Sequence, residues 1–196
     1  TLKNRRLLDT LSRHEKLLDA QKACLVVVDV QERFASHIDG FDGLVKNIVI
    51  MLKAASILGL PVIITEQYVK GLGPTVSAIK DAAPEACYFE KNCFPVTGAD
   101  GFVEHLKNLA VVKQVIVTGI ETHVCVNQSV HELLRLGYQV HVVEDAVGSR
   151  FAPNKRAALE KMRSNGADLT VMEMALFEML KEAGTDKFKA VQALVK

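Results

Sequence analysis

The sequence predicts a single-domain α/β fold: a doubly wound parallel sheet of six strands with helices on both faces. Short apolar runs rich in β-branched residues alternate with helical patterns, and most connections between them are short. The hydrophobic fraction of 49% is ample for one core, and 196 residues fall within the size range of one domain. We expect an N-terminal amphipathic helix over residues 1–20 and the domain itself over residues 21–196.

The N-terminal segment places leucines among basic and acidic residues. Because the segment is short and mixed in charge, we expect it to pack on the domain or on a neighbouring subunit rather than to bind a membrane. The leucines that approximate one apolar stripe at helical spacing are Leu7, Leu8, Leu11, Leu17 and Leu18.

The strands and helices of the domain follow in alternation. The first strand, 24–30, is an unbroken apolar run with one acid, Asp29, near its end, which is typical of a strand buried on both faces. Residues 66–84 contain glycines and prolines without strong periodicity and are expected to form a loop over the site, with a surface connection that has no functional role as the alternative. The other strands are expected at 61–65, 86–89, 114–118, 139–143 and 167–172, and helices at 44–58, 99–109, 125–136 and 153–165.

Composition excludes several classes of protein. The net charge of +1 supplies no field that attracts nucleic acid or an anionic membrane. The four cysteines form no CxxC pair, which indicates reduced thiols and a cytoplasmic location. No apolar run reaches the roughly 18 to 20 residues needed to cross a bilayer. A targeting segment removed before Thr1 is left open.

Three chemically active residues are expected at one edge of the sheet. Asp29 closes the first strand, Lys91 follows the third, and Cys125 begins the helix after the fourth. Because the carboxyl ends of parallel strands share one edge, these side chains can converge. Each alone also has a structural explanation: a helix cap, a solvated lysine, and a small buried apolar residue.

Together these residues suit acyl transfer. A thiol on the first turn of a helix ionises more easily because of the helix dipole, and a nearby lysine acts in the same direction. Asp29 can receive the thiol proton, and backbone N–H groups of the turn at 119–125 can hold the oxyanion of a tetrahedral intermediate.

Three blocks of sequence carry a family resemblance. Residues 28–31 (VDVQ), 89–94 (FEKNCF) and 117–126 (VTGIETHVCV) resemble, in order and spacing, the signature blocks of the isochorismatase-like cysteine hydrolases. The resemblance extends from about residue 22 to the end of the chain. Residues 65–68 (TEQY) and 71–75 (GLGPT) are similar to the isochorismatase domain-containing subgroup.

The resemblance implies a catalytic triad of Asp29, Lys91 and Cys125 on a six-stranded parallel sheet. It also implies a cis peptide between Ile120 and Glu121, with the backbone N–H groups of Glu121 and Cys125 as the oxyanion hole. Family substrates include amides and N-carbamoyl compounds, which form a thioester that water hydrolyses. Isochorismatases proper cleave a vinyl ether without needing the cysteine, so Cys125 indicates the amidase branch.

One departure from the family concerns metal binding. Nicotinamidases carry an Asp-x-His metal motif after the second strand, whereas this chain has Thr65 to Tyr68 there and no histidine between His37 and His105. Glu66 alone is weak support for a zinc site. We therefore expect no metal and no cofactor.

The remaining expectations concern substrate and partners. We expect a small-molecule substrate, no nucleic acid or membrane partner, and a homo-oligomer. His123 lies too close to Cys125 in sequence to favour a Cys-His dyad and is expected to line the pocket or contact another subunit. A catalytically silent oligomeric scaffold is the alternative to an enzyme. Residues expected to bind substrate are Gln31, Phe34, Gln67, Tyr68, Leu72, Phe94, Thr122 and His123.

Overall fold

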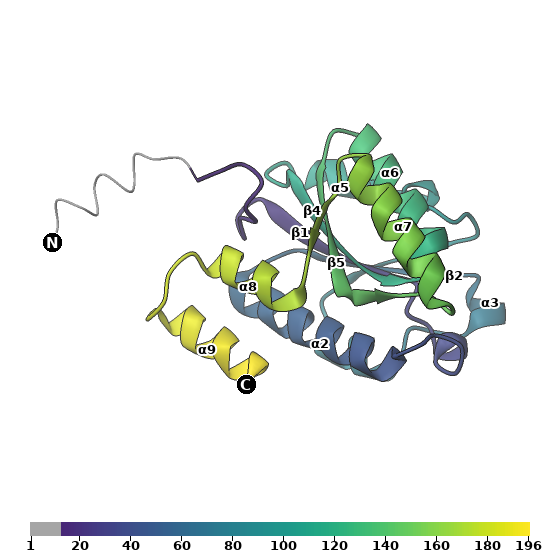
Figure 1. Ribbon diagram of the computed structural model, residues 1–196, viewed down its shortest axis with the longest axis horizontal. Helices are drawn as coiled ribbons and strands as arrows, with labels where there is room; N and C mark the ends of the chain where they lie inside the picture. Colours follow the sequence, from purple (N-terminus) through teal and green to yellow (C-terminus); the bar gives the residue numbers. More distant parts are fainter. Residues whose placement is uncertain (1–12) are drawn as a thin grey trace, which may run out of the picture.

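Six parallel strands run through the centre of the protein in the order β3-β2-β1-β4-β5-β6 (Figure 1). The computed structural model describes residues 13–196. This arrangement confirms the predicted doubly wound α/β sheet. The strands are β1 (Ala23–Val28), β2 (Val62–Gln67), β3 (Cys87–Lys91), β4 (Gln114–Ile120), β5 (Gln139–Gly148) and β6 (Asp168–Thr170).

Helices cover both faces of the sheet. One layer contains α2 (Phe41–Leu58), α8 (Met172–Leu180) and α9 (Asp186–Val195), and the opposite layer contains α5 (Phe102–Asn108), α6 (Asn127–Arg135) and α7 (Ala152–Ser164) (Figure 1). Two further short helices, α3 (Val69–Leu72) and α4 (Ser77–Ala82), follow β2. Short turns of helix are η1 (Glu32–Phe34), η2 (Val96–Gly98) and the π-helical η3 (Thr122–Val126).

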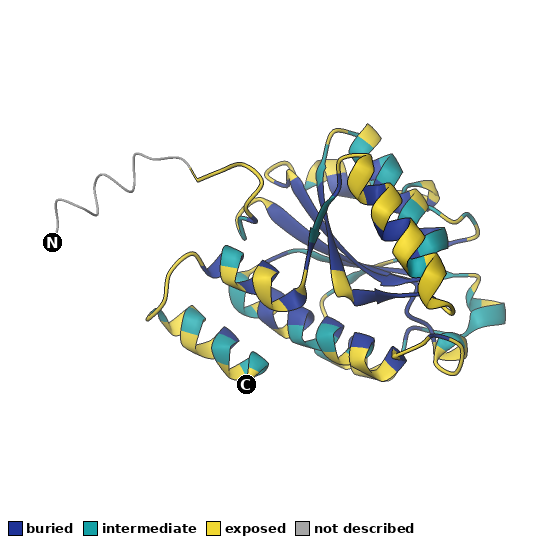
Figure 2. Ribbon diagram, viewed as in Figure 1, coloured by how far each residue is buried: buried dark blue, intermediate teal, exposed yellow. Residues whose placement is uncertain are grey.

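The central strand β1 divides the two cores. Leu25 and Val27 pack into the core beneath α2, whereas Val26 and Val28 pack into the core beneath α5, α6 and α7. Successive side chains of a strand point to opposite faces, so an unbroken apolar run is what a strand covered on both sides requires. Figure 2 shows the result: the central strands β1 and β4 are buried throughout, and helices are buried along one side only.

Several boundaries differ from the sequence expectations. The predicted loop at 66–84 contains the end of β2 and the helices α3 and α4, which are too short to produce a periodic pattern. Strand β5 extends to Gly148 because it continues past Glu144 and Asp145, two exposed acids that interrupt the apolar run where the ladder with β4 shifts register.

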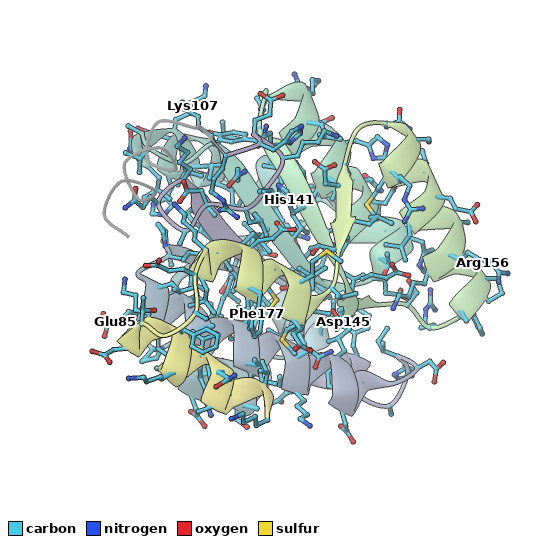
Figure 3. All side chains as sticks on the ribbon, turned by 60° about the vertical axis from the view of Figure 1, so that its left-hand side comes forward. Glu85, Lys107, His141, Asp145, Arg156 and Phe177 are labelled. Carbon is cyan, nitrogen blue, oxygen red and sulfur yellow. The ribbon has the colours of Figure 1, made fainter. Side chains whose placement is uncertain are left out.

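The two ends of the chain also depart from the expected pattern. Of the predicted N-terminal helix, residues 1–12 lie outside the described residues, and residues 13–20 form turns. At the other end, α8 and α9 are not predicted from the sequence; they contact each other through Phe177 and Phe188, whose ring centroids lie 6.1 Å apart (Figure 3). Within residues 13–196, no helix combines the length and apolar character needed to cross a membrane.

The strand order defines where a site can form. The chain winds outward from β1 in both directions, so β1 and β4 are neighbours whose following connections leave on opposite faces of the sheet. A crevice at such a switch point, beyond the carboxyl ends of the strands, is where open α/β sheets bind ligands. Asp29 follows β1 directly, and η3 with Cys125 follows β4.

Candidate active site

Asp29 is held by a turn immediately after β1. Its φ of 52° lies in the left-handed region, which aspartate tolerates better than most residues. The carboxylate is 1% exposed. Its Oδ1 accepts a hydrogen bond from Thr65 Oγ1 at 2.7 Å, and its Oδ2 accepts one from Lys91 Nζ at 2.6 Å. The acid that is anomalous in an apolar strand is therefore a buried, paired carboxylate.

Lys91 ends β3 and lies in register with Gln67, the last residue of β2. Its side chain is fully buried. The ammonium donates to three oxygens: Asp29 Oδ2 at 2.6 Å, Gln67 Oε1 at 2.7 Å and the carbonyl of Cys93 at 3.2 Å. An ammonium has three N–H donors, so these acceptors occupy all of them.

Cys125 lies in η3, which runs directly into α6, and it is 8% exposed. Its sulfur donates to Gln67 Oε1 at 3.5 Å. Burial, and after it the charge of Asp29, raise the pKa of the thiol to about 12, and the opposing effect of Lys91 is smaller. The expectation of an eased ionisation is wrong here, because burial and the neighbouring carboxylate outweigh the effect of the lysine. At neutral pH the thiol keeps its proton.

Asp29 and Cys125 face one small cavity of about 230 Å³. Of the residues expected to bind substrate, Phe34, Gln67, Leu72 and Phe94 line it. Lys91 is not part of the lining and contacts the cavity residues Asp29 and Gln67. The full lining is Asp29, Phe34, Gln67, Leu72, Phe94, Ile120, Glu121, Val124, Cys125 and Arg150.

Gln31 and Tyr68 do not line this cavity. Gln31 is completely buried, and its amide is used by the backbone: Nε2 donates to the carbonyls of Gln67 and Gly73, and Oε1 accepts from Gln67 N. Gln31 therefore supports the backbone of Gln67, which lines the cavity, without lining the cavity itself. Tyr68 is 57% exposed and lines a different cavity.

Thr122 and His123 are likewise outside the cavity lining. Thr122 is completely buried. His123 lies 3.0 Å from Ser149 Oγ through Nδ1 and 3.4 Å from Asn154 Nδ2 through Nε2. These contacts direct the histidine toward the segment after β5 rather than toward Cys125. They argue against a Cys-His dyad and against a place for His123 in the pocket wall.

Arg150 is a cavity residue that the sequence analysis missed, together with Ile120 and Val124. Glu121 Oε2 accepts hydrogen bonds from Arg150 N at 3.0 Å and Arg150 Nε at 3.1 Å. The carboxyl end of β5 lies beside that of β4, so the position of Arg150 was accessible to sequence reasoning. The strand was expected to end at residue 143, which concealed it. The peptide bond joining Ile120 to Glu121 is cis.

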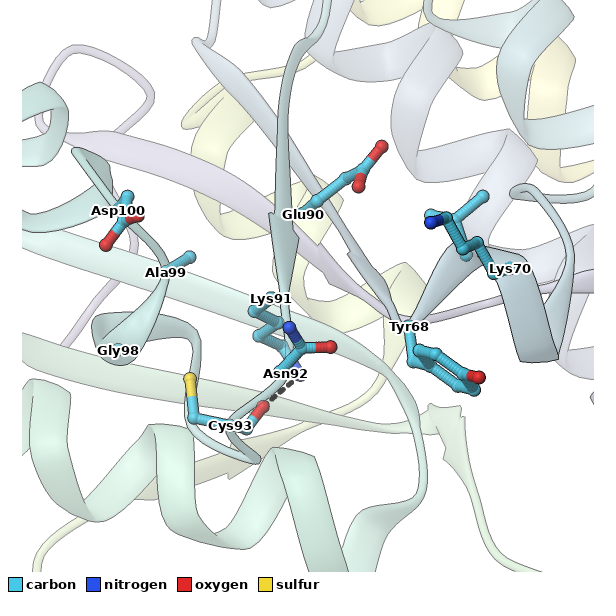
Figure 4. Close-up of a pocket in the computed structure, with 10 residues that line it drawn as sticks. Tyr68, Lys70, Glu90, Lys91, Asn92, Cys93, Gly98, Ala99 and Asp100 are labelled. Atoms are coloured by element: carbon cyan, nitrogen blue, oxygen red, sulfur yellow. Dashed lines mark hydrogen bonds between the residues drawn. The ribbon is translucent and has the colours of Figure 1, made fainter.

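A larger cavity of about 640 Å³ lies along β3 (Figure 4). Tyr68, Glu90, Cys93 and Asp100 contribute to its lining. Figure 4 shows the bond from Lys91 Nζ to the carbonyl of Cys93, whose own thiol donates to the carbonyl of Pro95 at 3.4 Å. Cys93 therefore belongs to this cavity rather than to the one that holds Cys125.

Glu66, the carboxylate considered for metal binding, accepts a hydrogen bond from Thr75 N at 2.7 Å. This contact pins the segment after α3 to β2. Across residues 13–196, His, Cys, Asp and Glu side chains are nowhere grouped in threes with metal-binding geometry.

Comparison with known proteins agrees with this geometry. Residues 23–174 match the isochorismatase domain. The chain is 38% identical to isochorismatase domain-containing protein 2 of Xenopus laevis, over 91% of this chain and 85% of that protein. Two solved structures superpose with TM-scores of 0.86. One, described as MAR1 ribonuclease of Caenorhabditis elegans, is 38% identical over 91% of each chain.

The other structure, the YcaC gene product of Escherichia coli, is described as an octameric hydrolase of unknown specificity. It is 26% identical, over 93% of this chain and 91% of that one. The predicted resemblance is thereby confirmed. The family match spans most of the residues between β1 and α8, including all three residues of the candidate triad, and the chain belongs to the isochorismatase family of hydrolases.

Proposed function

We propose that this protein is a cysteine hydrolase that cleaves a small amide or a related C–N bond through a thioester intermediate. The observation that carries the proposal is the buried Asp29–Lys91 pair at 2.6 Å beside a buried thiol, with Asp29 and Cys125 lining one cavity. A nucleophile needs a proton acceptor in reach and a third group that orients the acceptor. We assign these three roles to Cys125, Asp29 and Lys91, in that order.

The reaction begins with a neutral thiol. Cys125 Sγ attacks the amide carbonyl carbon while its proton passes to Asp29, and a C–S bond forms. Asp29 then returns this proton to the nitrogen, the C–N bond breaks and the amine leaves. Water attacks the thioester with Asp29 as base, the C–S bond breaks, and the sulfur regains a proton as the acid departs.

Lys91 acts electrostatically in this scheme. Its three N–H donors are engaged by oxygens of the protein, so its task is to hold the Asp29 carboxylate in place and to offset its charge. We assign the oxyanion hole to the backbone N–H groups of Glu121, which immediately precedes η3, and Cys125, which lies within it; both residues line the cavity.

The cavity favours a small substrate with an apolar acyl group. Its volume is about 230 Å³, and five of its ten lining side chains are apolar. The ammonium of Lys91 offsets the carboxylate of Asp29, and Arg150 offsets Glu121. Because one relative is described as a ribonuclease, RNA is the alternative substrate to compare. An apolar, charge-balanced cavity favours a neutral amide over a phosphodiester.

The test is hydrolysis of a panel of aliphatic amides and N-carbamoyl compounds, with single-stranded RNA alongside. We expect amine release by the wild-type protein, loss of at least about 10³-fold in Cys125→Ala and Asp29→Asn, and a mass increase equal to the acyl group on Cys125 in quenched samples. Turnover that survives Cys125→Ala, or cleavage of RNA alone, refutes the proposal. No turnover of any substrate favours the scaffold alternative.

We also propose that the protein is a homo-oligomer. The octameric E. coli relative supports this. Light scattering coupled to size exclusion should give a mass that is a multiple of 21.5 kDa. A monomer at micromolar concentration contradicts it.

A further inference from the structure

Gln67 connects the three residues of the candidate triad. Its Oε1 accepts hydrogen bonds from Lys91 Nζ at 2.7 Å and from Cys125 Sγ at 3.5 Å. Lys91 in turn donates to Asp29 at 2.6 Å. One amide oxygen therefore lies between the ammonium and the thiol, and its two lone pairs are both used.

The orientation of this amide follows from its neighbours. Gln67 Nε2 donates to the carbonyl of Asn92 at 3.1 Å. A reversed amide would point its N–H groups at the ammonium of Lys91 and its oxygen at the carbonyl of Asn92, replacing two hydrogen bonds with two repulsions.

The backbone of Gln67 is fixed as firmly as its side chain. The buried amide of Gln31 binds both the N–H and the carbonyl of Gln67, at 2.8 Å and 2.9 Å. Tyr68 N then donates to the carbonyl of Lys91 at 3.0 Å, which closes the ends of β2 and β3 together. Because its backbone and its side-chain amide are both fixed by hydrogen bonds, Gln67 can hold its partners in a defined geometry.

We propose that Gln67 is a positioning residue that keeps Lys91 directed at oxygen and holds the Cys125 proton until substrate arrives. Its oxygen accepts one N–H of the ammonium and also the S–H, and both contacts favour the neutral thiol over the thiolate. The thiol is thus protected from alkylation and oxidation in the resting protein, since the thiolate is the reactive form. The effect on turnover rests on the proposed hydrolase function; the effect on the thiol does not.

Two isosteric variants separate this role from simple packing. In Gln67→Met the S–H loses its acceptor and Lys91 has a donor free for the sulfur, so both changes favour the thiolate. In Gln67→Glu both acceptor contacts remain, but an added negative charge disfavours the thiolate. The variants should therefore shift thiol reactivity in opposite directions.

The experiment measures iodoacetamide alkylation of Cys125 by peptide mass spectrometry between pH 6.5 and 10. We expect Gln67→Met to react about threefold to tenfold faster than wild type at pH 7.5, because thiolate fraction gains more than nucleophilicity loses. Gln67→Glu should react several-fold slower. Amide turnover should fall about tenfold or more in both, since both disturb the alignment of Lys91 and Asp29.

Gln139→Met is the matched control. Gln139 also accepts a hydrogen bond through Oε1, from Gln114 Nε2 at 3.0 Å, but it begins β5 at the opposite end of the sheet. Its alkylation profile should match wild type. Thermal unfolding of each variant verifies the fold, and if Gln67→Met does not fold, Gln67→Glu alone carries the test.

The proposal is refuted if the alkylation rate of Cys125 shifts in the same direction in both Gln67 variants, or if it shifts in neither variant. Gln67 is then a packing residue. These measurements need no substrate. If no amide is ever hydrolysed but the opposite shifts occur, the proposed function fails and the role of Gln67 stands. If amides are hydrolysed and the shifts are absent, the proposed function stands and the role of Gln67 fails.

Discussion

Replacing Lys91 with methionine isolates the buried ion pair at the centre of the site. The substitution keeps side-chain length and removes the charge, so the Asp29 carboxylate, 1% exposed, retains the Thr65 hydroxyl but loses its cation. Removing one member of a buried pair costs about 3 to 5 kcal/mol. For a protein of this size that corresponds to a fall in Tm of about 6 to 20 °C.

The exposed pair between Arg135 and Glu132 provides the control. Its N–O distance is also 2.6 Å, but its side chains are 69% and 38% exposed. Arg135→Met should cost about 1 kcal/mol or less, because water already solvates both charges. Equilibrium unfolding in urea gives both values.

A double variant, Asp29→Leu with Lys91→Met, completes the comparison. Because it leaves no isolated charge, it should recover much of the stability lost in Lys91→Met. The reasoning is refuted if Lys91→Met is as mild as Arg135→Met, or if the double variant is destabilised by the sum of its single changes.

Three further predictions concern stability elsewhere. Gly119 has a φ of +111° and its Cβ would overlap the backbone of Val28, so Gly119→Ala should prevent soluble expression; Gly137→Ala, at φ +88° in open space, should cost about 1 to 2 kcal/mol by chemical denaturation. Burial raises the pKa of Cys24 from 9.0 to about 12, so its stabilising effect is complete below pH 9 and lost as pH rises toward 12. Cys24→Val should reduce the alkaline slope of unfolding free energy by about 1.4 kcal/mol per pH unit, and an unchanged slope contradicts this. Burial lowers the pKa of His141 below 6.5, against the charges of Asp168 and Glu178, so the fold loses stability as pH falls below 6.5; His141→Leu should flatten the unfolding free energy between pH 6.5 and 5, and a parallel curve contradicts it.

The centre of the sheet was predictable because β1 and β4 are buried on both faces. A run such as 24–30 cannot alternate when helices cover both sides, and its unbroken apolar character identifies it. Elements that lack this property were missed or misplaced. The helix α8 has apolar residues on most of its surface, so it shows little periodic contrast, and β5 continues through exposed Glu144 and Asp145.

The site was predictable as far as strand ends determine it. Asp29 and the segment bearing Cys125 follow β1 and β4, and Lys91 ends β3, so topology alone brings all three to the carboxyl edge of the sheet. The roles of individual side chains were harder to predict from the sequence, because they depend on hydrogen bonds between loops. Gln31 and Gln67 look equivalent in sequence, yet the amide of Gln31 is used by the backbone while that of Gln67 reaches the thiol.

The ionisation state of Cys125 shows why the identity of the site residues alone does not determine their chemistry. A helix start and a lysine argue for an ionised cysteine, but desolvation and the neighbouring carboxylate oppose them, and the pKa of Cys125 rises to about 12. With the thiol neutral, the two carboxylates at the site, Asp29 and Glu121, are each offset by a cation, Lys91 and Arg150. A cavity without net charge gives an anionic substrate no electrostatic advantage and penalises its desolvation. An uncharged amide meets no such penalty, and in the proposed mechanism its carbonyl develops negative charge only during attack, as the thiol proton moves to Asp29.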